Sequence, residues 1–188
     1  MIVRYAPFLA IMLVSLCACS GASHPSKPPV SRIALHQEAE SALRRVREEL
    51  LAAARETVFS LPETPTYTEQ VSFLVRNPGA ATGEDALGQH RRIEVDGRDL
   101  VVVEGDAPHE RRTVLTQRVA PRLAGERKNS IDDNGNGLID ESGFHCVLSG
   151  DEVVARPSLE ARDADGSPLV ETVEARFRIP NGRSAEAR

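Results

Sequence analysis

The stretch "SRIALHQEAESALRRVREELLAAARETVFS", residues 31–60, decides the fold class. It contains no Gly or Pro, and its apolar residues recur at alternating steps of three and four residues, which is the spacing of one helical face. That face comprises Ala39, Leu43, Val46, Leu50, Ala53 and Thr57. The pattern predicts one long amphipathic helix, which the segment "LPETP" ends at residues 61–65. The helix packs either on a sheet of the same domain or on a partner protein.

The residues after the helix alternate between apolar and polar, which is the pattern of half-buried β-strands. "YTEQVSFLVR" alternates in this way at residues 67–76, and Asp96-Gly97 between two apolar runs predicts a tight hairpin. A second hairpin is predicted where "EVVARPSLEAR" and "VETVEARFRI" flank "DADGSP". In the last run, one face carries Val173, Ala175, Phe177 and Ile179. The order predicts an α+β fold, in which a long N-terminal amphipathic helix packs on an antiparallel β-sheet.

The N-terminal segment "MIVRYAPFLAIMLVSLCACSG" has the pattern of an export signal. One basic residue precedes an apolar run that is too short for a permanent membrane span. The end of the run, "LCAC", resembles the lipobox of bacterial lipoproteins, with Leu16 three residues before Cys19 and the small Ala18 next to it. The resemblance implies a lipoprotein signal peptide at residues 1–18 and lipidation of Cys19. The alternative is an ordinary secretory signal that is cleaved near Ala22.

The segment after Cys19, "SGASHPSKPPVS", is rich in Ser and Pro, as expected of an extended tether at residues 19–31. The residue after Cys19 is Ser rather than Asp, and by resemblance to lipoprotein sorting rules this favours the outer membrane. The expected location is therefore the cell envelope, where the lipid on Cys19 binds the membrane. The remaining chain is predicted to form one domain at residues 32–183, followed by a tail at residues 184–188.

Composition and motif content argue against two classes of function. The net charge of −5 offers no basic surface to a polyanion, so no nucleic-acid partner is expected. The five His residues are scattered, and no hydrolase, zinc-protease or phosphate-loop motif is present, so we expect that the protein is not an enzyme. Cys146 lies between apolar neighbours in "GFHCVLSG" and is expected to be a small buried hydrophobic residue.

The segment "SIDDNGNGLIDESG", residues 130–143, has the spacing of a calcium loop. EF-hand-type loops place oxygen ligands at positions 1, 3, 5 and 9 and Gly at position 6, and the chain follows this pattern when counted from Asp132. Position 12 is Gly143 where a bidentate Glu is expected, and Glu141 is close enough in sequence to fold back in its place. The candidate ligands of the loop at residues 132–143 are Asp132, Asn134, Asn136, Leu138, Asp140 and Glu141.

The predicted calcium site is weak, with a dissociation constant on the order of 10⁻⁴ to 10⁻³ M, because few of its ligands carry charge. Residues 129–152 contain six acids and no Lys or Arg, so a cation would relieve their mutual repulsion. Ile139, at position 8 of the loop, is expected to pin the loop to the domain. The alternative is a turn without a metal ion, because Asn-Gly-Asn-Gly forms turns on its own.

From the helix onward the chain resembles minor pseudopilins and type IV pilin-like proteins of bacterial secretion and pilus systems. The resemblance covers about residues 31–183, and it rests on the "NGNGLIDE" loop, the hairpin around "DADG" and a last strand that ends near "RIPNG". It implies a long helix packed on an antiparallel sheet, with pseudopilins or other envelope proteins as partners. The chain departs from prepilins because the lipobox and tether take the place of the Gly-Phe cleavage site and the long apolar helix.

These patterns lead to one expected function and two alternatives. The expected function is that of a non-enzymatic, lipid-anchored envelope protein with a pilin-like domain, which acts as a binding or assembly accessory of a secretion or pilus apparatus and carries a weak calcium site. The first alternative is a stand-alone surface lipoprotein that calcium stabilises and that has no role in secretion. The second is an envelope enzyme, which would require a cleft.

Overall fold

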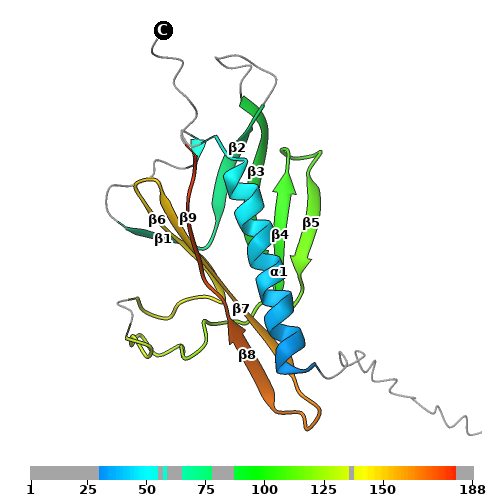
Figure 1. Ribbon diagram of the computed structural model, residues 1–188, viewed down its shortest axis with the longest axis vertical. Coiled ribbons are helices and arrows are strands. Elements are labelled where there is room, and N and C mark those ends of the chain that lie inside the picture. The colour runs from blue at the N-terminus through cyan, green and yellow to red at the C-terminus, as the bar shows by residue number, and fades with distance from the viewer. Residues whose placement is uncertain (1–29, 55–56, 59–64, 78–86, 136–137, 181–188) are drawn as a thin grey trace, which may run out of the picture.

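A computed structural model describes residues 30–54, 57–58, 65–77, 87–135 and 138–180 of the chain (Figure 1). The described residues form one helix and nine strands. The elements are α1 (Arg32–Leu51), β1 (Thr66–Thr68), β2 (Val71–Arg76), β3 (Leu87–Asp96), β4 (Asp99–Glu104), β5 (Arg111–Thr116), β6 (Phe144–Ser149), β7 (Glu152–Arg162), β8 (Pro168–Thr172) and β9 (Ala175–Arg178).

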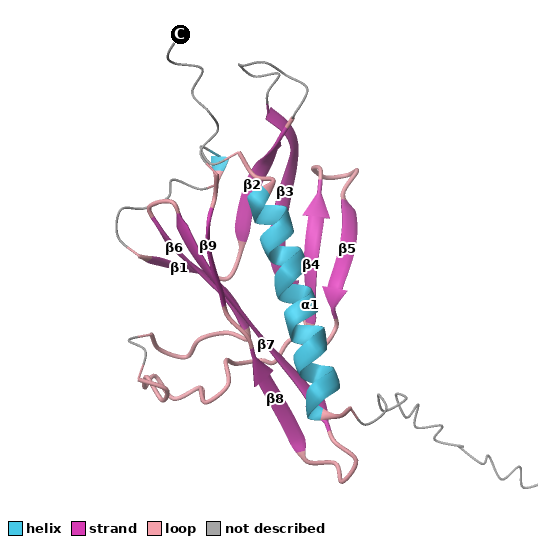
Figure 2. Ribbon diagram, in the orientation of Figure 1, coloured by secondary structure: helices cyan, strands magenta, loops and turns pink. Residues whose placement is uncertain are grey.

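The strands form two antiparallel sheets rather than one, and the predicted α+β fold class is wrong. One sheet has the order β2-β3-β4-β5, and the other has the order β1-β6-β7-β8, with β9 also paired to β7. The described residues are mostly β, with 45% in strands and a single short helix, whereas the sequence predicted a long helix packed on a sheet. Figure 2 shows that strands make up most of the described regular structure.

The second sheet arises because the predicted strand at residues 67–76 is divided between two partners. The first part, β1, pairs with β6, and Thr66 lies opposite Leu148. The second part, β2, pairs with β3, and Val71 lies opposite Ile93. The alternation in "YTEQVSFLVR" is compatible with either arrangement, because a period of two defines the faces of a strand but not its neighbours.

The helix begins where the sequence predicts and ends earlier. Ser31 caps its N-terminus, and the Ser31 side chain accepts a hydrogen bond from the Ala34 backbone N–H at 3.2 Å. The helix stops at Leu51 instead of continuing to residue 60. The chain that follows adds to the edge of β2, where the Ala54 N–H donates to the Leu74 carbonyl at 2.8 Å. Pairing with a strand edge thus overrides the helical periodicity of residues 52–54.

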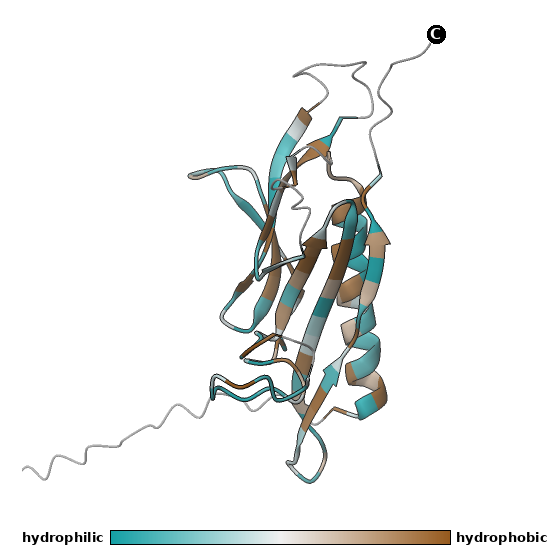
Figure 3. Ribbon diagram, turned by 90° about the vertical axis from the view of Figure 1, so that its left-hand side faces the viewer, coloured by the Kyte–Doolittle hydropathy of each residue, from teal (hydrophilic) through white to brown (hydrophobic). Residues whose placement is uncertain are grey.

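A single apolar core joins α1 to both sheets, and we call it the helix core. Its fully buried helical residues include Leu35, Ala39, Val46 and Leu50, three of which the sequence assigned to the buried face. The helix contacts β7, β8 and β9 of one sheet and β5 of the other. The strand residues of the helix core include Phe73, Ile93, Leu100, Phe144, Val153, Leu159 and Ile179. Figure 3 shows apolar stretches along the strands, which alternate with hydrophilic stretches on the strands and on α1.

Polar pairs at the margin of the helix core attach α1 to both sheets. Arg91 of β3 donates to Glu49 of the helix at 2.6 Å and to Glu104 of β4 at 2.7 Å. On the other side, His36 of the helix lies 2.7 Å from Glu171 of β8. These pairs are partly shielded from water, so they fix the position of the helix more firmly than exposed ion pairs would.

Both predicted hairpins are confirmed. Strands β3 and β4 pair with Asp96 opposite Asp99, so the two loop residues are Gly97 and Arg98 rather than the predicted Asp96 and Gly97. Strands β7 and β8 pair with Arg162 opposite Pro168, around the "DADG" turn. The last predicted run is divided into β8 and β9, and its apolar face remains inside: Val173, Phe177 and Ile179 are at most 8% exposed.

Several predictions concern residues outside the described part of the chain. These are the signal peptide at residues 1–18, Cys19, most of the tether at residues 19–31, and the tail at residues 184–188. Among the described residues, no helix combines the length and apolar character needed to cross a bilayer.

Candidate metal site in the loop between β5 and β6

The connection between β5 and β6, residues 117–143, contains the predicted calcium loop, and we call it the acidic loop. Its described residues form no helix and no named strand, and Figure 2 shows it as a long excursion from the sheets. Its first part is fixed to β7 by a bridge between Val119 and Leu159 and by a hydrogen bond from the Ala120 N–H to the Ser158 carbonyl at 2.8 Å. The loop is therefore attached to the domain before the calcium motif begins.

Two of the predicted ligands adopt a compact turn. The Asp132 carboxylate accepts a hydrogen bond from the Gly135 N–H at 2.6 Å, and Gly135 has a positive φ of 74°. The Asn134 side chain donates to Glu141 at 3.0 Å. Short Asp and Asn side chains stabilise such turns by bonding to nearby backbone. Leu138 lies within the described chain, whereas Asn136 lies outside the described residues.

Asp140 is oriented toward the start of the motif. Its carboxylate accepts hydrogen bonds from the Asn129 N–H at 2.9 Å and from the Ser130 N–H at 3.2 Å. Both Ser130 and Asp140 have positive φ values, of 60° and 53°. The Asp140 side chain thus closes the loop by holding its two ends together.

Glu141 is directed into the domain, and its predicted role as a metal ligand stays a prediction. Its side chain is only 1% exposed, and it meets Asn134, which stands at position 3 of the motif. On its other side, the Glu141 Oε1 atom lies 3.6 Å from the His145 Nε2 atom. Glu141 is therefore buried at the base of the acidic loop.

Glu126 is a second buried acid that the sequence analysis missed. It is 8% exposed, and its Oε1 atom accepts a hydrogen bond from the Asn134 N–H at 3.2 Å. Its Oε2 atom is buried and has no hydrogen-bond partner among the described residues. Glu126 precedes the motif in "AGERKN", where no spacing rule marks it, so only the folded chain brings it to Asn134.

Steric crowding explains why position 12 of the motif is a glycine, Gly143. A Cβ atom built on Gly143 would lie 1.8 Å from the Ala120 carbonyl oxygen. Gly143 also accepts a hydrogen bond from the Ser158 N–H at 2.6 Å. The close approach of these backbones leaves no room for any side chain, so the twelfth-position Glu of an EF-hand is excluded here.

The expectation that Ile139 pins the loop is wrong. Ile139 is 60% exposed, and Ile131 at the other end of the motif is 58% exposed. The acidic loop is held instead by buried apolar residues before the motif, namely Val119, Ala120 and Leu123, and by polar contacts within the motif.

Beside the acidic loop, His145 of β6 is completely buried and stacks on Tyr67 of β1, with ring centroids 4.9 Å apart. Burial lowers the pKa of His145 and raises the pKa of Tyr67. The neighbouring Cys146 is part of the helix core, and burial raises the pKa of its thiol to about 12. The predicted role of Cys146 as a buried hydrophobic residue is confirmed, since a thiol with this pKa is protonated at neutral pH.

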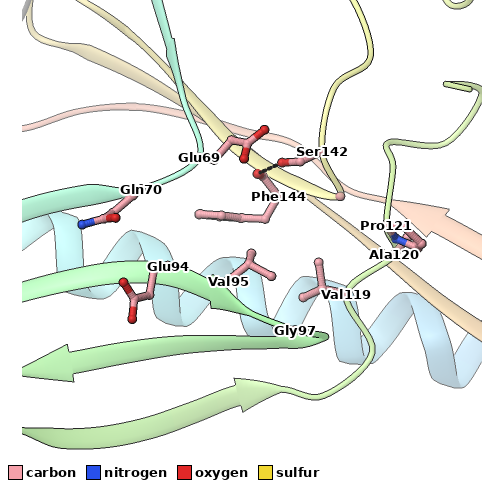
Figure 4. Close-up of a pocket in the computed structure, with 11 residues that line it drawn as sticks. Glu69, Gln70, Glu94, Val95, Gly97, Val119, Ala120, Pro121, Ser142 and Phe144 are labelled. Atoms are coloured by element: carbon pink, nitrogen blue, oxygen red, sulfur yellow. Dashed lines mark hydrogen bonds between the residues drawn. The ribbon is translucent and has the colours of Figure 1, made fainter. Parts of the chain in front are cut away.

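A pocket of about 320 Å³ opens next to the acidic loop, between the two sheets (Figure 4). Glu69 and Glu94 line it, together with Ser142, Gly143 and Phe144 at the end of the loop. The polar side chains are engaged in internal bonds. Glu94 pairs with two arginines, Glu69 accepts from the Tyr67 hydroxyl at 3.0 Å, and Ser142 donates to the Phe144 carbonyl at 2.5 Å.

Within the described residues, no group of three or more His, Cys, Asp or Glu side chains is placed to hold a metal ion. A cation at the acidic loop would therefore need amide or carbonyl oxygens alongside two carboxylates. Calcium accepts such mixed oxygen ligands, whereas zinc favours nitrogen and sulfur.

No protein-family model, no curated protein and no solved structure matches the chain.

Proposed function

We propose that the protein is a non-enzymatic, lipid-anchored protein of the cell envelope whose acidic loop binds calcium weakly. The observation that carries this proposal is the position of Glu141, whose carboxylate is 1% exposed and lies against Asn134 of the calcium motif. A buried carboxylate that faces the motif supplies a charged oxygen ligand for a divalent cation at the base of the loop.

The charge distribution supports a cation in this region. Residues 129–152 contain six acids and no Lys or Arg, while the chain as a whole carries a net charge of only −5. Ions bind where like charges concentrate, because the bound ion relieves their repulsion. Carboxylate, amide and carbonyl oxygens are the ligands that calcium prefers.

The proposed anchor rests on the lipobox-like "LCAC" and on the Ser- and Pro-rich residues that follow Cys19. A single acyl chain holds a protein on a membrane only marginally, so stable anchoring requires more than one. Lipidation of Cys19 with several acyl chains would keep the domain at the membrane while the tether holds it away from the lipid surface.

Calcium binding is tested by thermal unfolding of the full chain in detergent, with chelator or with calcium at about 10 mM, which exceeds the ~10⁻³ M limit expected for such loops. We expect calcium to raise the melting temperature and magnesium at the same concentration to have a smaller effect, because Mg²⁺ retains its water shell. Equal melting temperatures with chelator and with calcium would contradict the calcium role.

Anchoring is tested by mass spectrometry of the full chain expressed in a lipoprotein-processing bacterium. We expect the N-terminal peptide to begin at Cys19 and to carry acyl chains. The matched variant Cys19→Ser should appear without acyl chains and in the soluble fraction. A wild-type N-terminus near Ala22 without lipid would instead establish ordinary secretion.

A second candidate function is that of an accessory to a secretion or pilus apparatus, favoured by the likeness of the "NGNGLIDE" loop to pseudopilins. A shallow depression of about 530 Å³ between α1 and the β8–β9 connection offers a surface for a partner, lined by Gln37, Ser41, Arg44, Arg47 and Glu174 among others. Affinity purification of the tagged chain from solubilised envelopes, with calcium present, tests this role. Recovery of pseudopilins or secretin would support it, and recovery of the bait alone would contradict it.

A further inference from the structure

Glu126 precedes the calcium motif in the sequence and contacts it in the structure. One of its two carboxylate oxygens has no hydrogen-bond partner among the described residues. The Oε1 atom accepts a hydrogen bond from the Asn134 N–H at 3.2 Å, so the carboxylate is directed at the loop. The Oε2 atom is buried and has no hydrogen-bond partner among the described residues. Buried carboxylate oxygens are normally satisfied, because an unsatisfied one loses its hydration without compensation. An unpartnered oxygen at this position therefore points to a missing ligand.

Glu141 reaches the same residue from the other end of the motif. Its Oε2 atom accepts from the Asn134 side chain at 3.0 Å, and its side chain is 1% exposed. The backbone nitrogen of Asn134 contacts Glu126 and its side-chain nitrogen contacts Glu141, so both carboxylates face one residue of the motif. A divalent cation beside Asn134 would be attracted to both carboxylates.

Glu126 also supplies what the motif lacks. An EF-hand loop obtains two of its oxygen ligands from the Glu at position 12. Here position 12 is Gly143, where a side chain would collide with the Ala120 carbonyl oxygen at 1.8 Å. A carboxylate that enters from the preceding segment avoids this collision and still faces Asn134 at position 3.

We propose that a calcium ion binds at the base of the acidic loop between the carboxylates of Glu126 and Glu141, with the side-chain oxygen of Asn134 as a third ligand. This assignment rests on the proposed calcium function and deepens it, because it moves the charged ligands from the exposed end of the motif to its buried base. Rotation of the Asn134 amide places its oxygen where its nitrogen now donates. Asp140 is not a ligand in this arrangement, since its carboxylate holds the Asn129 and Ser130 N–H groups.

The ion would connect two parts of the acidic loop that the backbone already brings together. The Leu123 N–H donates to the Glu141 carbonyl at 3.1 Å, and the Ala124 N–H donates to the Ser158 hydroxyl of β7 at 3.3 Å. Calcium held by Glu126 and Glu141 would join residues 123–126 to Asn134 and Glu141, and both to β7. Binding would thus stabilise the acidic loop against the second sheet.

The test compares isosteric variants of the full chain in detergent, each melted with chelator and with calcium. Glu126→Gln and Glu141→Gln remove one negative charge each and preserve side-chain shape. Glu40→Gln on α1 is the matched control, because it removes one exposed charge away from the loop. We expect Glu40→Gln to retain the calcium-induced rise in melting temperature, and both loop variants to need at least ~10-fold more calcium for the same rise.

The chelator arm separates a ligand from a purely structural residue. Glu126→Gln removes a buried charge whose Oε2 atom has no hydrogen-bond partner among the described residues, so without calcium the melting temperature of the variant should equal or exceed that of the wild type. A fall of the same size with and without calcium would overturn the assignment, because Glu126 would then stabilise the loop without the ion.

Failure of this assignment is distinguishable from failure of the calcium function. If the wild type shows no calcium-induced rise, the proposed function itself fails. If the wild type shows the rise and Glu126→Gln keeps it in full, calcium binds elsewhere and the assignment is wrong. Loss of the rise in Asp140→Asn while Glu126→Gln keeps it would place the ion at position 9 of the motif.

Discussion

The helix core buries apolar side chains from α1 and both sheets, whereas the acidic loop buries carboxylates. In the helix core, Leu35, Val46 and Leu50 are completely shielded from water. In the acidic loop, Ile131 and Ile139 are more than half exposed, while Glu126 and Glu141 are at most 8% exposed. The usual distribution of apolar and polar residues is therefore inverted over part of the acidic loop.

This difference shows that the two regions depend on different sources of stability. Burial of apolar area stabilises the helix core in any solvent condition that preserves the hydrophobic effect. The acidic loop depends on charges that a cation can neutralise, so its stability should vary with ionic composition. Perturbations of the two regions are therefore expected to differ in size and in their response to calcium.

The largest effect is expected from a charge placed in the helix core. Val46→Asp buries a carboxylate at a position that is 0% exposed and should cost about 4 kcal/mol or more, a large fraction of a typical domain's stability. We expect no cooperative thermal transition in this variant by circular dichroism. The control Arg47→Asp changes a neighbouring exposed residue and should unfold cooperatively. If Val46→Asp also unfolds cooperatively at the same temperature, this helical face is not part of the core.

The second prediction concerns the close contact between Gly143 and Ala120 at the two ends of the acidic loop. Gly143→Ala brings a Cβ atom 1.8 Å from the Ala120 carbonyl oxygen, so backbone must move, at a cost of about 3 kcal/mol. Gly97→Ala is the control, because a Cβ there meets nothing within 4 Å and only the positive φ of 64° is unfavourable, at about 1 kcal/mol. Urea unfolding measures both. Equal losses would mean that the contact with Ala120 relaxes freely.

The sequence predicts the helix core better than it predicts the arrangement of the strands. The period of the helical face placed Ala39, Val46 and Leu50 in the core, because burial of a helix is recorded in local spacing. The division of residues 67–76 between two sheets was missed, since alternation does not specify strand partners. The fold class was wrong for this reason and because the chain leaves the helix at Leu51 to pair with β2.

The candidate site divides in the same way. Spacing alone predicted the Asp and Asn ligands and Glu141 as a substitute for the acid at position 12, and their role as metal ligands stays a prediction. Glu126 could not be found from spacing, because tertiary contacts bring it to Asn134. The sequence does not explain why position 12 lacks an acid. The structure does, because Gly143 lies too close to Ala120 for any side chain.

A third, smaller effect concerns the charged margin of the helix core. Arg91→Ala leaves Glu49 and Glu104 half-buried without their shared guanidinium, which should cost about 2 kcal/mol. The control Arg176→Ala removes a pair with Glu152 at 3.5 Å whose arginine is 63% exposed, and it should cost about 0.5 kcal/mol or less. Both losses are measured by urea unfolding with and without calcium, and neither should depend on calcium. A calcium-dependent loss in Arg91→Ala would show that the two regions are coupled.

The smallest expected effect is a pH dependence at the junction of α1 and β8. The hydrogen bond from His36 to Glu171 raises the pKa of His36 above 6.5, and Glu40 on the same helix acts in the same direction. A raised folded pKa means that this contribution is fully present below pH 6.5 and is lost as pH rises through the folded value. We therefore expect the stability difference between the wild type and His36→Gln to be positive at about pH 5.5 and to vanish at about pH 8.5.

Urea unfolding at both pH values measures this difference, and Glu171→Gln should remove the same pH dependence, because it changes the other member of the pair. A difference that stays constant over this range would mean that the pair is too well solvated to stabilise the helix, and that apolar packing alone fixes α1 against the second sheet.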